Sequence, residues 1–139
     1  MERKDFIKQG CIACMAFMGA GVLLEGCGTS LPLVKTTVAN KTLSIPVSRF
    51  SDKNNVLIVR SSTLENDILL IKHENSYKAL YLKCTHEGVG LTATDKKIFC
   101  PAHGSVFDFD GKVVKEPALR PLTEFHTETT HENVIIHLI

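Results

Sequence analysis

The sequence has little net charge and no long apolar run. Lys and Arg total 16 against 15 Asp and Glu, which gives a formal charge of +1, and no basic cluster stands out. Proteins that bind nucleic acid carry clustered positive charge, so a nucleic-acid partner is not expected. The main apolar stretch, from Cys11 to Leu24, is shorter than the ~20 residues that a membrane-spanning helix needs.

The patterns of common enzymes are also missing. The chain has no Ser-His-Asp order, no phosphate-binding loop, no nucleotide-binding fingerprint and no internal repeat. Outside the N-terminal segment no stretch shows a convincing helical period. At 139 residues the chain is the size of one domain. We therefore expect one globular domain without a catalytic substrate site of its own.

Cysteine is scarce outside the N-terminal segment. Three of the five cysteines lie in the first 27 residues, and the rest of the chain holds only Cys84 and Cys100. If both bind a metal, no cysteine remains there for a structural disulfide, whatever the redox compartment.

Each of these two cysteines is followed closely by a histidine. The sequence reads CTH at 84–86 and CPAH at 100–103, with thirteen residues, 87–99, between the two. Thiolate and neutral imidazole are ligands that soft and borderline metals prefer. Glycine and proline mark both segments as loops. The pattern predicts two loops that meet over one metal centre.

Residue type and spacing leave two kinds of metal centre open. Structural zinc held by two cysteines and two histidines is common, but its usual signature pairs cysteine with cysteine and histidine with histidine. Here each loop offers one of each. That arrangement suits a two-iron cluster, in which one iron takes both thiolates and the other takes both imidazoles.

At these residues the sequence resembles the Rieske iron–sulfur family. CTH at 84–86 and CPAHGS at 100–105 match the two cluster-binding loops of the family, and the Gly and Pro positions over 107–122 match the sequence that follows them. The resemblance covers about 56–139. It implies one [2Fe-2S] cluster, which passes one electron at a time, with four ligands: Cys84 and Cys100 on the inner iron, His86 and His103 on the outer iron.

Three departures from the family pattern bear on the cluster. Many members join the loops by a disulfide, whereas this chain has Val89 and Ala102 at those positions. Phe107 replaces a tyrosine that hydrogen-bonds a ligand sulfur in high-potential members, although Ser105 keeps the companion hydroxyl. Hydrogen bonds to the sulfurs raise the reduction potential, so we expect a lower potential than in disulfide- and tyrosine-bearing members. Glu87 stands where quinol-oxidising members have an apolar residue, and a buried carboxylate would carry a desolvation cost.

The scaffold is predicted to be all-β, a Rieske-type domain of two or three small antiparallel sheets with two cluster-binding loops. Strand signals are runs of β-branched and apolar residues bounded by turn residues. An Asp110-Gly111 turn indicates a hairpin. The predicted strands are 43–46, 56–60, 68–71, 77–82, 106–109, 112–115, 122–128 and 134–139.

The N-terminal segment, residues 1–27, resembles an export signal. A charged start is followed by the apolar run and by Leu24-Glu25-Gly26-Cys27, which resembles the lipobox of bacterial lipoproteins, with Cys27 as the acylated residue. An uncleaved membrane anchor and a cytosolic helix are the alternatives. Residues 28–40 are expected to form a flexible tether, and 41–139 the Rieske [2Fe-2S] domain.

Together these observations predict an exported, membrane-tethered electron carrier in the bacterial cell envelope, facing the periplasm or the exterior. It would exchange electrons with redox partner proteins in a respiratory or other oxidoreductase chain. A soluble Rieske-type ferredoxin of an oxygenase system and a structural zinc module are the alternatives. Only 36 residues follow His103 (104–139), too few for the large domain of a Rieske oxygenase. The remaining histidines, His73, His126, His131 and His137, are expected to be structural or exposed, without a second metal site.

Overall fold

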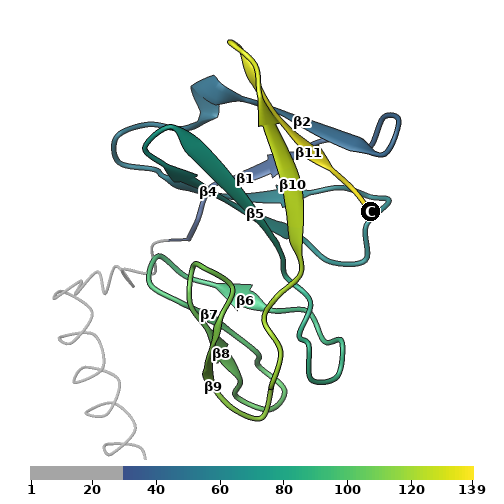
Figure 1. The fold of residues 1–139 in the computed structure, drawn as a ribbon, viewed down its shortest axis with the longest axis vertical. Coiled ribbons are helices and arrows are strands. Elements are labelled where there is room, and N and C mark those ends of the chain that lie inside the picture. The colour runs from purple at the N-terminus through teal and green to yellow at the C-terminus, as the bar shows by residue number, and fades with distance from the viewer. Residues whose placement is uncertain (1–29) are drawn as a thin grey trace, which may run out of the picture.

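Eleven β-strands and one short 3₁₀ segment make up the secondary structure of residues 30–139, which are the residues that the computed structural model describes. No α-helix occurs in this part of the chain, and the predicted all-β fold is confirmed (Figure 1). The 3₁₀ segment η1 is Val47–Arg49. The strands are β1 (Leu33–Lys35), β2 (Thr42–Pro46), β3 (Val56–Arg60), β4 (Ile68–His73), β5 (Ser76–Tyr81), β6 (Thr92–Ala93), β7 (Ile98–Phe99), β8 (Val106–Phe107), β9 (Val113–Lys115), β10 (Glu124–Thr129) and β11 (Asn133–His137).

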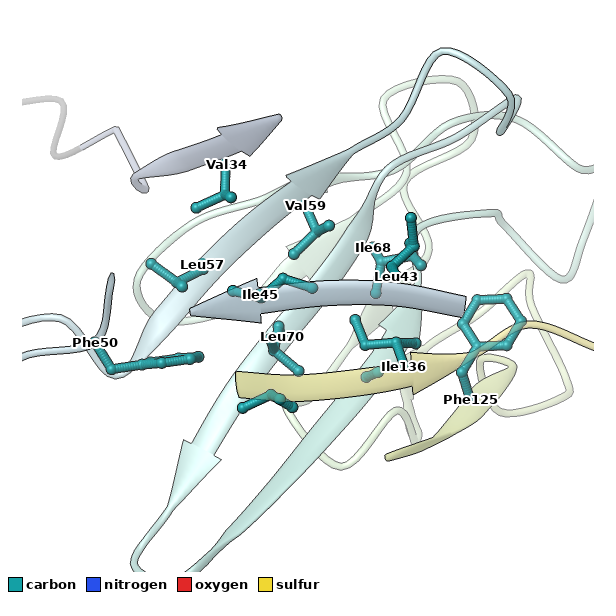
Figure 2. Close-up of a cluster of buried hydrophobic side chains, with 12 residues drawn as sticks. Val34, Leu43, Ile45, Phe50, Leu57, Val59, Ile68, Leu70, Phe125 and Ile136 are labelled. Atoms are coloured by element: carbon teal, nitrogen blue, oxygen red, sulfur yellow. The ribbon is translucent and has the colours of Figure 1, made fainter. Parts of the chain in front are cut away.

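Seven of the strands form the larger sheet, in the order β1-β3-β4-β5-β10-β11-β2. β1 runs parallel to β3, and every other neighbouring pair in this sheet is antiparallel. The sheet curls so that β2 and β11 pack across β3 and β4, and apolar side chains fill the space between them (Figure 2). We call these side chains the first core: Val34, Leu43, Ile45, Phe50, Leu57, Val59, Ile68, Leu70, Ala79, Phe125, Val134 and Ile136.

The edge strand β1 lies within the stretch for which the sequence predicts a flexible tether, residues 28–40. The structure instead places residues 33–35 in the larger sheet, and only 6% of the Val34 side chain is exposed. The Ile58 N–H donates to the Pro32 carbonyl at 2.8 Å and holds the start of the strand. One buried residue between two exposed ones is too short a pattern to indicate a strand from sequence.

Strand β4 is buried on both faces, which explains its continuous apolar run. Successive side chains of a strand point to opposite faces of the sheet. Ile68 and Leu70 accordingly enter the first core, while Leu69 and Ile71 enter a second core on the other side. The second core contains Leu69, Ile71, Leu80, Leu82, Cys84, Ile98, Cys100, Phe107, Ala118 and Leu122. It joins the two sheets and includes both cysteines of the domain.

The smaller sheet has four strands in the order β6-β7-β8-β9, all antiparallel, and lies below the larger sheet in Figure 1. Strands β6 and β7 were not predicted, because two residues each carry no readable alternation. The segment between β5 and β6 contains the first loop (residues 84–89), and the segment between β7 and β8 contains the second loop (residues 100–105). The smaller sheet thus positions both candidate ligand loops.

The predicted turn at Asp110-Gly111 connects β8 to β9. The carboxylate Oδ1 of Asp108 accepts the N–H groups of Asp110 at 3.0 Å and Lys112 at 2.9 Å. Gly111 has φ +79°, and a Cβ at that position would lie 3.0 Å from Leu80 Cδ2. Glycine therefore lets this turn approach the larger sheet closely.

Candidate metal centre

The first loop is closed by two backbone hydrogen bonds of its own. The Cys84 N–H donates to the Val89 carbonyl at 2.7 Å, and the Gly88 N–H donates back to the Cys84 carbonyl at 2.8 Å. Gly88 has φ +73°, a left-handed conformation that glycine adopts without steric cost. The loop is fixed by its own peptide groups, so it presents Cys84 from a preformed turn.

The second loop repeats the same construction. The Cys100 N–H donates to the Ser105 carbonyl at 2.8 Å, and the Gly104 N–H donates to the Cys100 carbonyl at 3.0 Å. Gly104 has φ +80°. In each loop the cysteine carbonyl accepts a hydrogen bond from the glycine four residues later, and the cysteine N–H donates to the carbonyl of the residue after that glycine. The spacing Cys-x-x-x-Gly, present in both loops, is the sequence signal of this shared geometry.

The two predicted cysteine ligands share one buried cluster, and the two predicted histidine ligands lie side by side and exposed. Only 3% of Cys84 and 1% of Cys100 is exposed, and both are free thiols within the second core. His86 and His103 are exposed, with ring centroids 5.1 Å apart and ring planes at 89°. A buried pair of sulfur donors and an exposed pair of imidazole donors offer two kinds of coordination position, which is what a two-iron cluster requires.

Glu87 adds a carboxylate to the histidine end of the site. Its Oε2 lies 3.7 Å from His103 Nε2, although 57% of the Glu87 side chain remains exposed. Ligand atoms of His86, Glu87 and His103 lie within 4.8 Å of one another, and this is the single such group among residues 30–139. The acidic side chain therefore lies at the candidate site.

Ser105 ends the second loop, Phe107 follows two residues later in β8, and both are completely buried. The Ser105 Oγ accepts the Ala118 N–H at 3.0 Å. A hydroxyl that accepts a backbone hydrogen still has its own hydrogen to donate. Phe107 belongs to the second core beside both cysteines and brings no polar atom to it.

Sequence reasoning missed a polar clamp that holds the first loop. The Thr85 Oγ1 donates to the Arg120 carbonyl at 2.7 Å, and the Arg120 guanidinium donates back to the Thr85 carbonyl at 3.2 Å. Val89, which stands at one of the disulfide positions of other proteins with this motif, packs against the second core. The loop is thus held by packing and hydrogen bonds, as expected from the missing cysteines. No local pattern links Thr85 to a residue 35 positions away.

Cys27, the predicted lipidation residue, lies outside the described residues. Among residues 30–139 the structure contains no helix with the length and apolar character needed to cross a bilayer.

Comparison with protein families gives one match that covers most of the domain. The model of the Rieske [2Fe-2S] domain matches residues 43–126. This range includes both loops and the clamp between Thr85 and Arg120.

Several curated relatives are iron–sulfur subunits of cytochrome b6-f complexes. The iron–sulfur subunit 1 of the cytochrome b6-f complex from Nostoc sp. is 28% identical over 99 residues, which cover 66% of this chain and 55% of that protein. The corresponding subunit from Synechococcus elongatus is 42% identical over 55 residues, 38% of this chain and 31% of that protein. The chain therefore spans about half of the first relative's length.

Solved structures share the fold. The cyanobacterial plasma membrane Rieske protein PetC3 from Synechocystis PCC 6803 has a TM-score of 0.53 and 25% identity, over 66% of this chain and 93% of that one. A chain of the hyperthermophilic respiratory complex III has a TM-score of 0.54 at 19% identity, over 92% of both chains. The second likeness shows the fold alone.

Proposed function

The chain belongs to the Rieske [2Fe-2S] family, so its cofactor is a [2Fe-2S] cluster, and we propose that the paired loops hold this cluster through Cys84, Cys100, His86 and His103. Membership in this family replaces the structural zinc module as the explanation of the motif. The protein is an iron–sulfur electron-transfer protein.

The side chains present fit the cluster. The buried Cys84 and Cys100 suit the inner iron, because an apolar core shields the charged thiolates and sulfides from water. The exposed His86 and His103 suit the outer iron. When bound, the cluster accepts and returns one electron. The histidine pair is the part of the site that a partner protein can approach, so electrons would enter and leave at this end.

Three side chains near the ligands, those of Ser105, Phe107 and Glu87, would influence the reduction potential of the cluster. The spare hydrogen of Ser105 would donate to a cluster sulfur, which favours the reduced, more negative state. Phe107 offers no second donor, and Glu87 places negative charge beside the outer ligand His103. Ser105 acts to raise the potential, whereas Phe107 and Glu87 together support a potential below that of tyrosine-bearing relatives, within a family range of about −150 to +300 mV.

The proposed setting is the bacterial cell envelope, with the domain held at the membrane by lipid on Cys27 or by an uncleaved anchor and facing the periplasm or exterior. The lipobox-like sequence Leu24–Cys27 supports this proposal. Related proteins belong to the cytochrome b6-f complex, and a similar structure is a plasma membrane Rieske protein. By analogy, the partners would be redox proteins of a membrane-bound oxidoreductase chain.

The observation that carries the ligand assignment is the pair of identically closed loops, with thiols inside and imidazoles outside. It is tested by the EPR spectrum of the dithionite-reduced protein. The Cys84→Ser and Cys100→Ser variants should lose the rhombic Rieske signal, and His103→Cys should change it toward that of an all-cysteine cluster. His73→Asn, exposed at the end of β4, is the control and should leave the spectrum unchanged. A Rieske spectrum that survives loss of Cys84 would overturn the assignment.

The membrane attachment is tested separately. Mass spectrometry of the membrane fraction should find a diacylglyceryl group on Cys27, and Cys27→Ser should release the protein. Purification in mild detergent should then recover the redox partners with the native protein but not with the released variant. An unmodified Cys27 in a chain that still begins at Met1 would favour the uncleaved anchor.

A further inference from the structure

The β10–β11 hairpin belongs to the larger sheet and lies away from the smaller sheet β6–β9 (Figure 1). It carries a second group of candidate ligand residues. His126 of β10 is directly opposite His137 of β11, and their ring centroids are 5.5 Å apart. Glu128 follows two residues after His126, so it points to the same face of the sheet. Phe125, Val134 and Ile136 occupy the opposite face, in the first core.

The carboxylate of Glu128 lies close to both imidazoles. Its Oε2 is 3.3 Å from His137 Nε2, and its Oε1 is 3.9 Å from His126 Nε2. The Nε2 atom of His137 is covered from solvent and has no hydrogen-bond partner, although the carboxylate oxygen is near. A covered ring nitrogen that faces a carboxylate without a hydrogen bond is unsatisfied, and an ion between the two groups would satisfy both.

We infer that His126, Glu128 and His137 form a second metal site, which binds a divalent transition-metal ion such as Zn²⁺. Two imidazoles and one carboxylate are an established ligand set for zinc and leave a fourth position for water. Oxygen-seeking ions such as Mg²⁺ and Ca²⁺ are disfavoured, because two of the three donors are nitrogen.

The hairpin holds most of this site in place before a metal binds. β11 is paired on both sides, so His137 is fixed opposite His126 on β10 and opposite Thr42 on β2. The His126 side chain is 73% exposed and has room to turn toward the carboxylate. This rotation is needed because the three ligand atoms do not yet lie within 4.8 Å of one another, as those of His86, Glu87 and His103 do.

The sequence alone gives no reason for a metal at these histidines. They are separated by the turn of the hairpin, and only the register of β10 against β11 brings them opposite each other. From the sequence, both histidines are expected to be merely structural or exposed. Their arrangement in the sheet instead supports a metal site.

The test is a Zn²⁺ titration of the oxidised, cluster-loaded full chain, followed by isothermal calorimetry. Loading the cluster occupies the histidines of the two loops, while the N-terminal cysteines Cys11, Cys14 and Cys27 remain available as zinc ligands. We expect one site whose affinity falls by about tenfold or more in His126→Ala and in His137→Ala, because losing even a hydrogen-bond partner of a ligand costs 10- to 100-fold. Zinc held by the cysteines would be unaffected by these two substitutions. His131→Ala, in the turn of the same hairpin, is the matched control and should bind as tightly as the native chain.

A spectroscopic readout identifies the ligands directly. One equivalent of Cu²⁺ added to the oxidised protein should show EPR couplings to two imidazole nitrogens, and His126→Ala should remove one of them. His126 is exposed, so this variant keeps the test valid even if the half-buried His137 cannot be replaced without unfolding. Absence of binding, or binding that is unchanged in His126→Ala, would refute the site and leave an ordinary surface ion pair. Neither result would affect the assignment of the cluster ligands.

Discussion

Replacing Ser105 by alanine removes one oxygen atom from a completely buried position at the end of the second loop. In the native chain that oxygen accepts the Ala118 N–H at 3.0 Å, and its own hydrogen is free to donate. The substitution should therefore have two separable effects. One is the loss of a donor to a cluster sulfur, and the other is an unpaired backbone N–H at Ala118.

The loss of the donor should lower the reduction potential. A hydrogen bond to a charged group contributes about 1.5–3 kcal/mol. Only the amount by which this bond is stronger in the reduced cluster than in the oxidised cluster shifts the midpoint potential. An excess of about 1–2 kcal/mol corresponds to a fall of roughly 40–90 mV, since a one-electron couple shifts ~59 mV for each ~1.36 kcal/mol. The unpaired Ala118 N–H should cost about 1–3 kcal/mol of folding free energy, because water cannot reach it.

Protein-film voltammetry measures the first effect, and thermal unfolding followed by circular dichroism measures the second. Thr94→Ala is the matched control, because the Thr94 hydroxyl also accepts backbone N–H groups, those of Lys96 and Lys97, in the turn between β6 and β7. It should lower stability without moving the midpoint. An unchanged midpoint in Ser105→Ala with an intact cluster spectrum would place this hydroxyl away from the sulfurs.

Three further substitutions test the surroundings of the cluster. Phe107→Tyr should raise the midpoint by adding a donor, and a null result in voltammetry would mean that the ring edge points away from the cluster. Glu87→Gln should also raise it, because the carboxylate 3.7 Å from His103 favours the oxidised state; a shift that does not shrink with added salt would contradict this exposed-charge explanation. Thr85→Val removes the hydrogen bond to the Arg120 carbonyl and should cost about 0.5–1.5 kcal/mol, with faster bleaching of the cluster on heating. Bleaching at the native rate would show that the clamp does not hold the loop.

Much of the site could be predicted because its chemistry is local in sequence. Cys84 and His86 share one loop, Cys100 and His103 share the other, and a glycine follows each cysteine at the same spacing. Alternating apolar residues likewise indicated most strands of the larger sheet. Such features depend on neighbouring residues, so the sequence displays them.

Other features depend on contacts between distant residues and left no local pattern. The clamp joins Thr85 to Arg120, and nothing near either residue marks it. Val34 joins the first core through a strand of three residues, in a stretch whose composition is that of a linker. Glu87 could be assigned only as a loop charge until the second loop placed His103 beside it.

β4 is apolar on both faces, so hydrophobic burial does little to fix which of its residues pair with those of β3 and β5. In a strand with one polar face, a slip of one residue would expose the apolar side chains and is strongly opposed. In β4 the same slip would only exchange isoleucine and leucine between two apolar compartments. The alignment must therefore depend on the strand's ends, where Arg60 of β3 donates two hydrogen bonds, at 2.9 and 2.7 Å, to Asp67 just before β4. An exposed ion pair of this kind adds little stability. The Arg60–Asp67 ion pair would instead favour the native register of β3 and β4 over a register shifted by one residue. Without Asp67, a fraction of the folded molecules would have the shifted register.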